Sequence, residues 1–151
     1  MTKIQYEIDI DAPVKQVYEY YTNPDNIKEA WPRDIVKESR AISGENNEEG
    51  AEMKVKGEYM GKEDEMTLEV TDKKDNKKLV TEQTEGPFKR WKSIQEFNGQ
   101  ENATHVRHTI EYELPTSGKI VNFLSSSGAD SKIEEGLHQA ANAVKQKLES
   151  A

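Results

Sequence analysis

His108 is the residue with the clearest capacity for chemistry, because it occupies an apolar position in an alternating strand pattern with Val106 and Ile110. A buried imidazole can donate a directional hydrogen bond to a bound molecule or act as a general base, since its pKa lies near neutrality and responds to burial. It can equally be a packed histidine bonded to a neighbouring side chain or water. His105 has the opposite parity, so the two histidines do not converge on a metal ion.

Two further polar residues, Ser93 and Gln95, share one side of a predicted strand with Trp91 and Phe97. Polar groups on an apolar face need hydrogen-bonding partners, and a cavity can supply them as ligand or water. Ser125 and the serines after it lack a histidine and an acid at the spacing of a nucleophilic triad. We therefore interpret those serines as a joint between two helices.

Composition excludes several classes of function. The net charge of −8 argues against nucleic-acid binding, which needs a basic face. The chain has no cysteine, hence no disulfide and no thiolate chemistry. Acidic residues at 9–11 and 45–52 lack the ligand spacing of a calcium site, and no nucleotide motif occurs, so we expect no metal and no cofactor. The length favours one domain over residues 1–151. Without a leader or a long apolar run, we expect a cytoplasmic protein without integral membrane association.

The first thirty residues predict a strand and two short helices. Ile4, Tyr6, Ile8 and Ile10 alternate with polar residues, which is typical of a half-buried strand. We expect Asp11 to cap a helix whose first turn holds proline, and the Asn-Pro pair at 23–24 to end it. A second short helix then runs from residue 25 to the Trp-Pro pair at 31–32.

Residues 34–114 follow a period of two that is interrupted by turn-forming segments. The breaks lie at residues 44–50, 60–61, 73–77, 85–87 and 98–102. Successive antiparallel strands with short connections are the economical interpretation, giving six strands here and seven with the first. At residues 34–43 and 77–84, either parity can face inward.

A helical stripe closes the chain. It consists of Ile133, Leu137, Ala140, Ala141, Val144 and Leu148. An earlier stripe around Ile120 and Leu124 lies roughly 140° away on a helical wheel, so one straight helix cannot bury both. We therefore predict that residues 117–150 are not one straight helix and that the joint lies at residues 125–128.

In order and spacing, nearly the whole chain resembles the START-like superfamily, also called SRPBCC or polyketide cyclase/dehydrase-like. The resemblance rests on Ile-Asp-Ala-Pro at 10–13 leading into a helix, Asn-Pro-Asp-Asn-Ile at 23–27 with Trp-Pro at 31–32, and a long helix after Leu-Pro at 114–115. It implies an α+β helix-grip fold, in which a seven-stranded curved antiparallel sheet wraps a long C-terminal helix around a cavity. Members bind sterols, lipids, polyketides or plant hormones there, and a minority catalyse cyclisation or dehydration.

The predicted ligand site is a cavity between this sheet and the terminal helix. Inward parity and the helical stripe place eight residues around it: Tyr59, Leu68, Trp91, His108, Ile110, Tyr112, Leu137 and Ala141. The favoured function is a carrier or sensor of a small hydrophobic molecule, which His108 orients without performing chemistry, because no second ionisable group is evident inside. The alternatives are a cyclase/dehydratase-type enzyme using His108, a tyrosine and a water, and an interaction module resembling the superfamily's chaperone activators. The sequence indicates neither the ligand's identity nor the oligomeric state.

Overall fold

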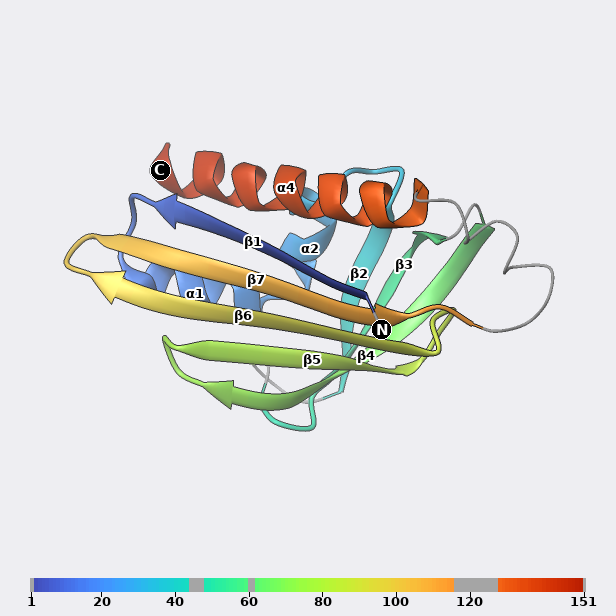
Figure 1. The fold of residues 1–151 in the computed structure, drawn as a ribbon. Coiled ribbons are helices and arrows are strands. Elements are labelled where there is room, and N and C mark those ends of the chain that lie inside the picture. Colours follow the sequence, from blue (N-terminus) through green and yellow to red (C-terminus); the bar gives the residue numbers. More distant parts are fainter. Residues whose placement is uncertain (1, 44–47, 60–61, 116–127, 151) are drawn as a thin grey trace.

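Seven strands form a single antiparallel sheet in the order β1-β7-β6-β5-β4-β3-β2 (Figure 1). The computed structural model describes residues 2–43, 48–59, 62–115 and 128–150. The strands are β1 (Thr2–Ile10), β2 (Val36–Ser43), β3 (Glu52–Tyr59), β4 (Lys62–Lys74), β5 (Lys78–Glu85), β6 (Arg90–Gln100) and β7 (Ala103–Glu113). Every pairing is antiparallel, and the seven-stranded prediction is confirmed.

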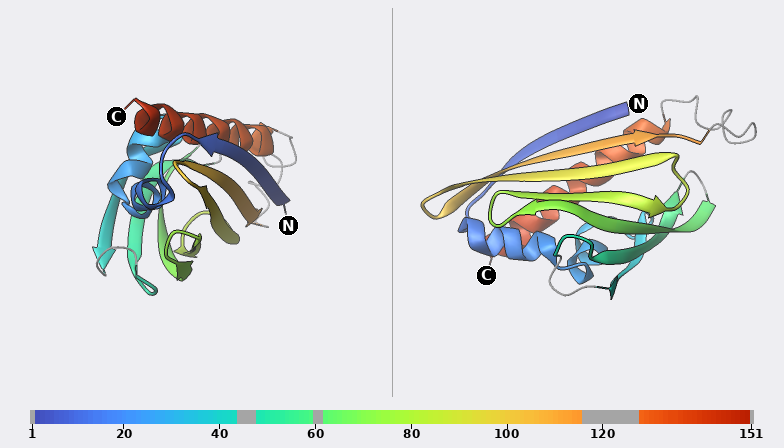
Figure 2. Two further views of the ribbon diagram at one scale, coloured as in Figure 1. Left: turned by 90° about the vertical axis from the view of Figure 1, so that its left-hand side faces the viewer. Right: turned by 90° about the horizontal axis from the view of Figure 1, so that it is seen from below.

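Within the described residues, three helices accompany the sheet: α1 (Val14–Thr22), α2 (Asp25–Ala30) and α4 (Gly128–Glu149). The first two connect β1 to β2, as predicted. The sheet curves from β1 beside α4 round to β2; α2 closes the side between α4 and β2, and α1 packs on β6 and β7 (Figure 2). This is the helix-grip arrangement, with one concave face turned toward α4.

The long helix α4 buries the stripe that its sequence predicts. Leu137, Ala140, Ala141, Val144 and Leu148 are all buried and pack against the concave face of the sheet. Such apolar burial contributes most of a helix's stability in a folded domain. The predicted joint at residues 125–128 lies outside the described residues, apart from Gly128, at which α4 begins.

The prediction that Asp11 caps α1 is wrong. The N-cap position belongs to Pro13, in an extended conformation, and no side chain caps the helix. The backbone N–H of Asp11 instead donates a 2.7 Å hydrogen bond to the Glu149 carboxylate. Tertiary contact with the end of α4 therefore organises this connection, where local sequence suggested a cap.

A register shift in β2 and burial of both faces of β5 explain why these two strands have no clear parity in the sequence. The register of β2 shifts between Val36 and Glu38, and the register of β4 against β5 shifts between Val70 and Asp72. A bulge places two residues opposite one and breaks the period of two. In β5, where the shift between Val70 and Asp72 adds no residue, the consecutive residues 79–81 are all buried, so burial there does not alternate between the two faces.

Candidate functional site

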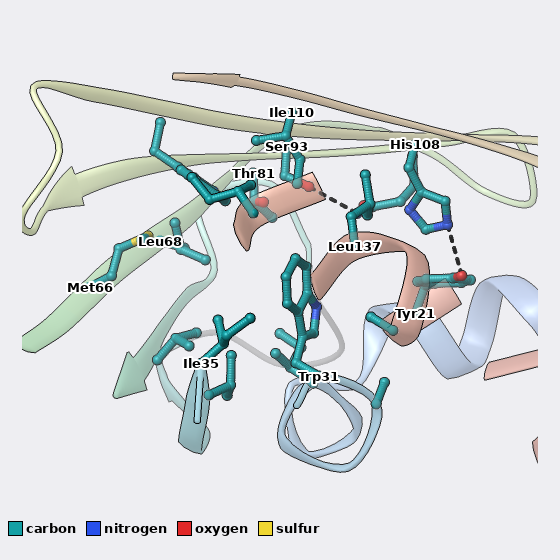
Figure 3. A pocket seen from close by; sticks show the side chains of 18 of the residues that line it. Tyr21, Trp31, Ile35, Met66, Leu68, Thr81, Ser93, His108, Ile110 and Leu137 are labelled. Carbon is teal, nitrogen blue, oxygen red and sulfur yellow. Dashed lines mark hydrogen bonds between the residues drawn. The ribbon is translucent and has the colours of Figure 1, made fainter. Parts of the chain in front are cut away.

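A pocket of about 560 Å³ lies between the concave face of the sheet, α2 and α4. Strands β3 to β7 supply one wall, the helices supply the other, and most of the lining is apolar (Figure 3). The larger apolar and aromatic side chains around it are Ile27, Trp31, Ile35, Met53, Val55, Met66, Leu68, Leu79, Phe88, Trp91, Ile110, Leu114, Ile133 and Leu137. The pocket exists because the curved sheet stands away from α4 at its β3–β5 side, while β1 packs directly on the helix.

Most of the predicted site residues lie around this pocket. Six of the eight line it: Leu68, Trp91, His108, Ile110, Leu137 and Ala141. Tyr112 does not line it, because its ring is completely buried against Phe88 and Trp91, at centroid distances of 5.8 Å and 6.0 Å. It therefore supports the Trp91 ring from beside the pocket. The side chain of Tyr59 lies outside the described part of the chain.

His108 is hydrogen-bonded to Tyr21, at 3.0 Å between Nε2 and the phenolic oxygen. Its side chain is almost completely buried, and Nδ1 has no hydrogen-bond partner among the described residues. Burial lowers the pKa of His108 to about 4 and raises the pKa of Tyr21 far above its usual range. Both groups are neutral at physiological pH, so Nδ1 is a free donor or a free acceptor according to which partner donates to the other.

The remaining polar side chains of the sheet wall form a row with His108. Gln95 Nε2 donates to Ser93 Oγ at 2.9 Å. Thr81 is the cross-strand partner of Ser93, and Gln95 is the cross-strand partner of His108. We call Thr81, Ser93, Gln95, His108 and Tyr21 the polar track; it crosses β5, β6 and β7 and ends at α1 (Figure 3). Every member borders the pocket, and further amide groups, those of Asn23 and Asn26, line it at the α1–α2 end.

The wall opposite the polar track depends on a glycine in α4. A Cβ atom at Gly136 would lie 2.6 Å from Ile35 Cδ1 and 3.0 Å from Trp31 Cζ3. Such distances are too short for carbon atoms, so only glycine lets these two side chains pack against α4 without displacement. Trp31 and Ile35 thus close the pocket between α2 and α4, facing the polar track (Figure 3).

Sequence reasoning missed the contribution of α2 and its junction with β2. Ile27, Ala30 and Trp31 recur at helical spacing and line the pocket, but α2 is too short for a helical stripe to show which side faces inward. A glycine in the middle of a strong helical pattern is costly unless close packing needs it. Gly136 was therefore a usable signal for a helix contact at this point.

Charged groups lie only at the edge of the pocket. Among the described lining residues, Glu58 and Lys132 alone carry charge; Lys132 is exposed and Glu58 half-buried. The described residues contain no cluster of three or more metal-ligating side chains. The arrangement suits an apolar molecule that is held by contact area and oriented by hydrogen bonds to a few uncharged side chains.

Within the described segments, no helix combines the length and apolarity needed to cross a lipid bilayer.

Comparison with known proteins identifies the family. Residues 1–149 match the family described as polyketide cyclase/dehydrase and lipid transport. No curated protein matches the sequence.

Solved structures share the fold at low sequence identity. TTHA0849 from Thermus thermophilus is 19% identical with a TM-score of 0.77, covering 99% of this chain and 98% of its own. A START superfamily protein from Mycobacterium smegmatis is 14% identical with a TM-score of 0.74, covering 98% and 97%. The Zhui aromatase/cyclase from a Streptomyces species is 14% identical with a TM-score of 0.76, covering 98% and 93%. The family match along almost the entire chain and the shared fold together show that this protein belongs to the START-like polyketide cyclase/dehydrase and lipid-transport family.

Proposed function

We propose that the protein binds a small hydrophobic molecule of lipid, sterol or polyketide type in this pocket, as a carrier or sensor. The observation that carries the proposal is the apolar pocket of about 560 Å³ with a polar track on one side. Ligand pockets commonly occupy roughly 300–1,000 Å³ and combine apolar lining with a few convergent polar groups. Family membership supports the same class of ligand.

An enzyme of the cyclase/dehydratase type is the second candidate, and the Tyr21–His108 pair with its free Nδ1 atom is the feature that favours it. Acid–base catalysis works best when the pKa of the catalytic group is near the working pH. Burial moves the pKa of His108 down to about 4 and that of Tyr21 upward, away from neutrality in both cases. The pair is therefore suited to hydrogen bonding, and we rank the carrier or sensor first.

Intrinsic fluorescence offers a direct test, because the chain has two tryptophans and both Trp31 and Trp91 line the pocket. We expect the uncharged probe N-phenyl-1-naphthylamine to quench tryptophan emission saturably with one site per chain. Native mass spectrometry of protein purified without denaturation then identifies any molecule that co-purifies.

Two matched substitutions on α4 locate the probe. Ala141→Leu extends a side chain into the pocket, whereas Ala143→Leu makes the same change at a half-buried position that does not line it. We expect Ala141→Leu to weaken probe binding by roughly tenfold or more through lost space, with Ala143→Leu unchanged. Absence of saturable quenching in the wild type, or equal affinities for the two variants, would contradict ligand binding in this pocket.

A further inference from the structure

We infer that the pocket selects uncharged molecules bearing a hydroxyl or carbonyl group on an apolar skeleton, and that Ser93 and Gln95 at the centre of the polar track recognise that group. The inference rests on the proposed function, since it specifies the class of ligand for the same site. Four observations support it: the exposure of these two residues, the local charge, the imidazole nitrogen without a partner among the described residues, and the apolar wall that β3 and β4 form beside the track.

Ser93 and Gln95 are only half-buried although both point to the concave side of the sheet. Their cross-strand partners on β7, Ile110 for Ser93 and His108 for Gln95, are almost completely buried. The residual exposure of Ser93 and Gln95 therefore comes from the pocket. A glutamine side chain has two donor hydrogens and a carbonyl acceptor, and the hydrogen bond to Ser93 uses one of the donors.

Among the described residues, the interior of the pocket offers no counter-charge to an ionised ligand. His108 is neutral because burial lowers its pKa to about 4, and the charged lining residues, Glu58 and Lys132, lie at the edge. The Lys132 ammonium also has a carboxylate neighbour, Asp34, at 3.9 Å. Burying a carboxylate or an ammonium without a partner costs several kcal/mol, whereas a hydroxyl or carbonyl group needs only the hydrogen bonds that the polar track supplies.

Nδ1 of His108 strengthens the requirement for a polar but neutral group. It is a buried polar atom without a partner among the described residues, and its neighbour across the sheet is Gln95. An unpaired buried polar atom is unfavourable, and a ligand group or a shift of Gln95 on binding would satisfy it.

The apolar wall formed by β3 and β4, beside the polar track on the same sheet, fixes the direction of the ligand. Met53, Val55, Met66 and Leu68 on β3 and β4 present apolar side chains to the pocket. Such a wall contributes through buried area but forms no directional bonds. The skeleton consequently lies against β3 and β4, and the polar group faces β6.

Three probes of one size test this selectivity: naphthalene, 2-naphthol, and 2-naphthoate, which is anionic at neutral pH. Binding is followed by quenching of the two pocket tryptophans in the intact protein. We expect 2-naphthol to bind several-fold more tightly than naphthalene, as one or two hydrogen bonds imply. We expect the dissociation constant of 2-naphthoate to be at least roughly tenfold higher than that of 2-naphthol.

Variants assign the effect to the polar track. Gln95→Leu should abolish the advantage of 2-naphthol over naphthalene, while Met66→Leu on the apolar wall should keep the ratio of the two affinities. Gln95→Lys supplies the missing cation and should raise the affinity for 2-naphthoate relative to 2-naphthol. A Gln95→Leu protein that keeps the wild-type ratio overturns the assignment even if Gln95→Lys fails to fold.

The outcomes separate this inference from the proposed function. Saturable binding of naphthalene together with equal or tighter binding of 2-naphthoate overturns the selectivity and leaves ligand binding intact. Failure of all three probes and of N-phenyl-1-naphthylamine to bind overturns both.

Discussion

The two histidines of β7 lie on opposite faces of the sheet, and their pKa values are shifted in opposite directions. His105 lies on the convex face, with Nδ1 2.7 Å from Asp9 and Nε2 2.9 Å from Glu7, and these carboxylates raise its pKa. His108, three positions later, lies on the concave face, where desolvation lowers the pKa to about 4. The same residue type therefore has its pKa raised by neighbouring carboxylates on one face and lowered by burial on the other.

The contrast extends to the whole sheet. The convex face is rich in charged residues that pair across strands, with opposite charges in Glu7–Arg107 and Lys92–Glu111 and like charges in Glu52–Glu69. Solvent and neighbouring charges stabilise these charged side chains whatever their exact positions. The concave face has few polar groups, and their positions matter because hydrogen bonds are stronger in a largely apolar environment. We therefore expect substitutions to be tolerated on the convex face of the sheet and to be costly on the concave face.

The largest expected difference between the faces is at Gly57. A Cβ atom at this concave position of β3 would overlap the backbone carbonyl of Ile35, and backbone cannot move as a side chain can. We expect Gly57→Ala to lower the free energy of unfolding by about 3 kcal/mol or more. The neighbouring Lys56→Ala, on the convex face, should change it by less than about 0.5 kcal/mol. Urea denaturation with unchanged slopes measures both, and similar losses in the two variants would contradict the contrast.

The two histidines predict opposite responses to pH. The pKa of His108 is lower in the folded protein than the ordinary value of 6.5, so acidification protonates the unfolded chain first and removes stability. Between pH of about 7.5 and about 5 the wild type should lose about 2 kcal/mol relative to His108→Gln. The pKa of His105 is raised, so its contribution is fully present below the unfolded pKa and disappears as the pH rises through the folded pKa.

Thermal or urea unfolding of the wild type, His108→Gln and His105→Gln across this range measures both contributions. Subtracting each variant from the wild type removes the background titration of the carboxylates. Parallel pH profiles for the wild type and His108→Gln would show that His108 does not change its proton affinity on folding.

Removing the Tyr21 hydroxyl should have a smaller effect. Tyr21→Phe takes away the group bonded to His108 Nε2, which leaves both imidazole nitrogens unpaired and should cost about 1 kcal/mol. Tyr20→Phe is the matched control, because this tyrosine also lines the pocket but its hydroxyl has no hydrogen-bond partner among the described residues. Equal unfolding free energies for the two variants would show that the Tyr21–His108 bond adds no stability.

The smallest effect should come from the convex face. Glu63 lies 3.2 Å from Lys37 and 3.3 Å from Lys56, and hydrogen bonds from the two lysines lower its pKa. All three side chains are well exposed, so solvent screens the pairs. Glu63→Gln should leave the urea midpoint unchanged at physiological salt, and a clear loss would show that this network stabilises the edge of the sheet.

Much of the fold could be predicted from local sequence. Each strand boundary coincides with a cluster of turn-forming residues, as between Lys74 of β4 and Lys78 of β5. The bulges of β2 and β4 could not be predicted, because they depend on the partner strand. The connection at Asp11 could not either, since Glu149, distant in the sequence, takes its N–H.

The sheet side of the pocket follows from strand parity, which turns Leu68, Trp91, His108 and Ile110 toward α4. Parity does not say which inward residues border open space, so Tyr112 was placed among the lining although it packs behind Trp91. The bond between Tyr21 and His108 joins residues 87 positions apart. Only the docking of α1 on the sheet brings these two side chains together.

The pairing of β1 with β7 also constrains how the chain folds. Ile4 lies opposite Ile110, so the first strand has no partner in the sheet until almost the entire sequence is available. Bringing such distant segments together costs chain entropy before any contact repays it, and folds dominated by distant pairings fold on the slow scale of about milliseconds to seconds. Stopped-flow refolding should therefore show a slow main phase, with β1 joining late. During synthesis, the apolar side of β1 stays exposed until β7 has left the ribosome, which is when this protein is most open to aggregation.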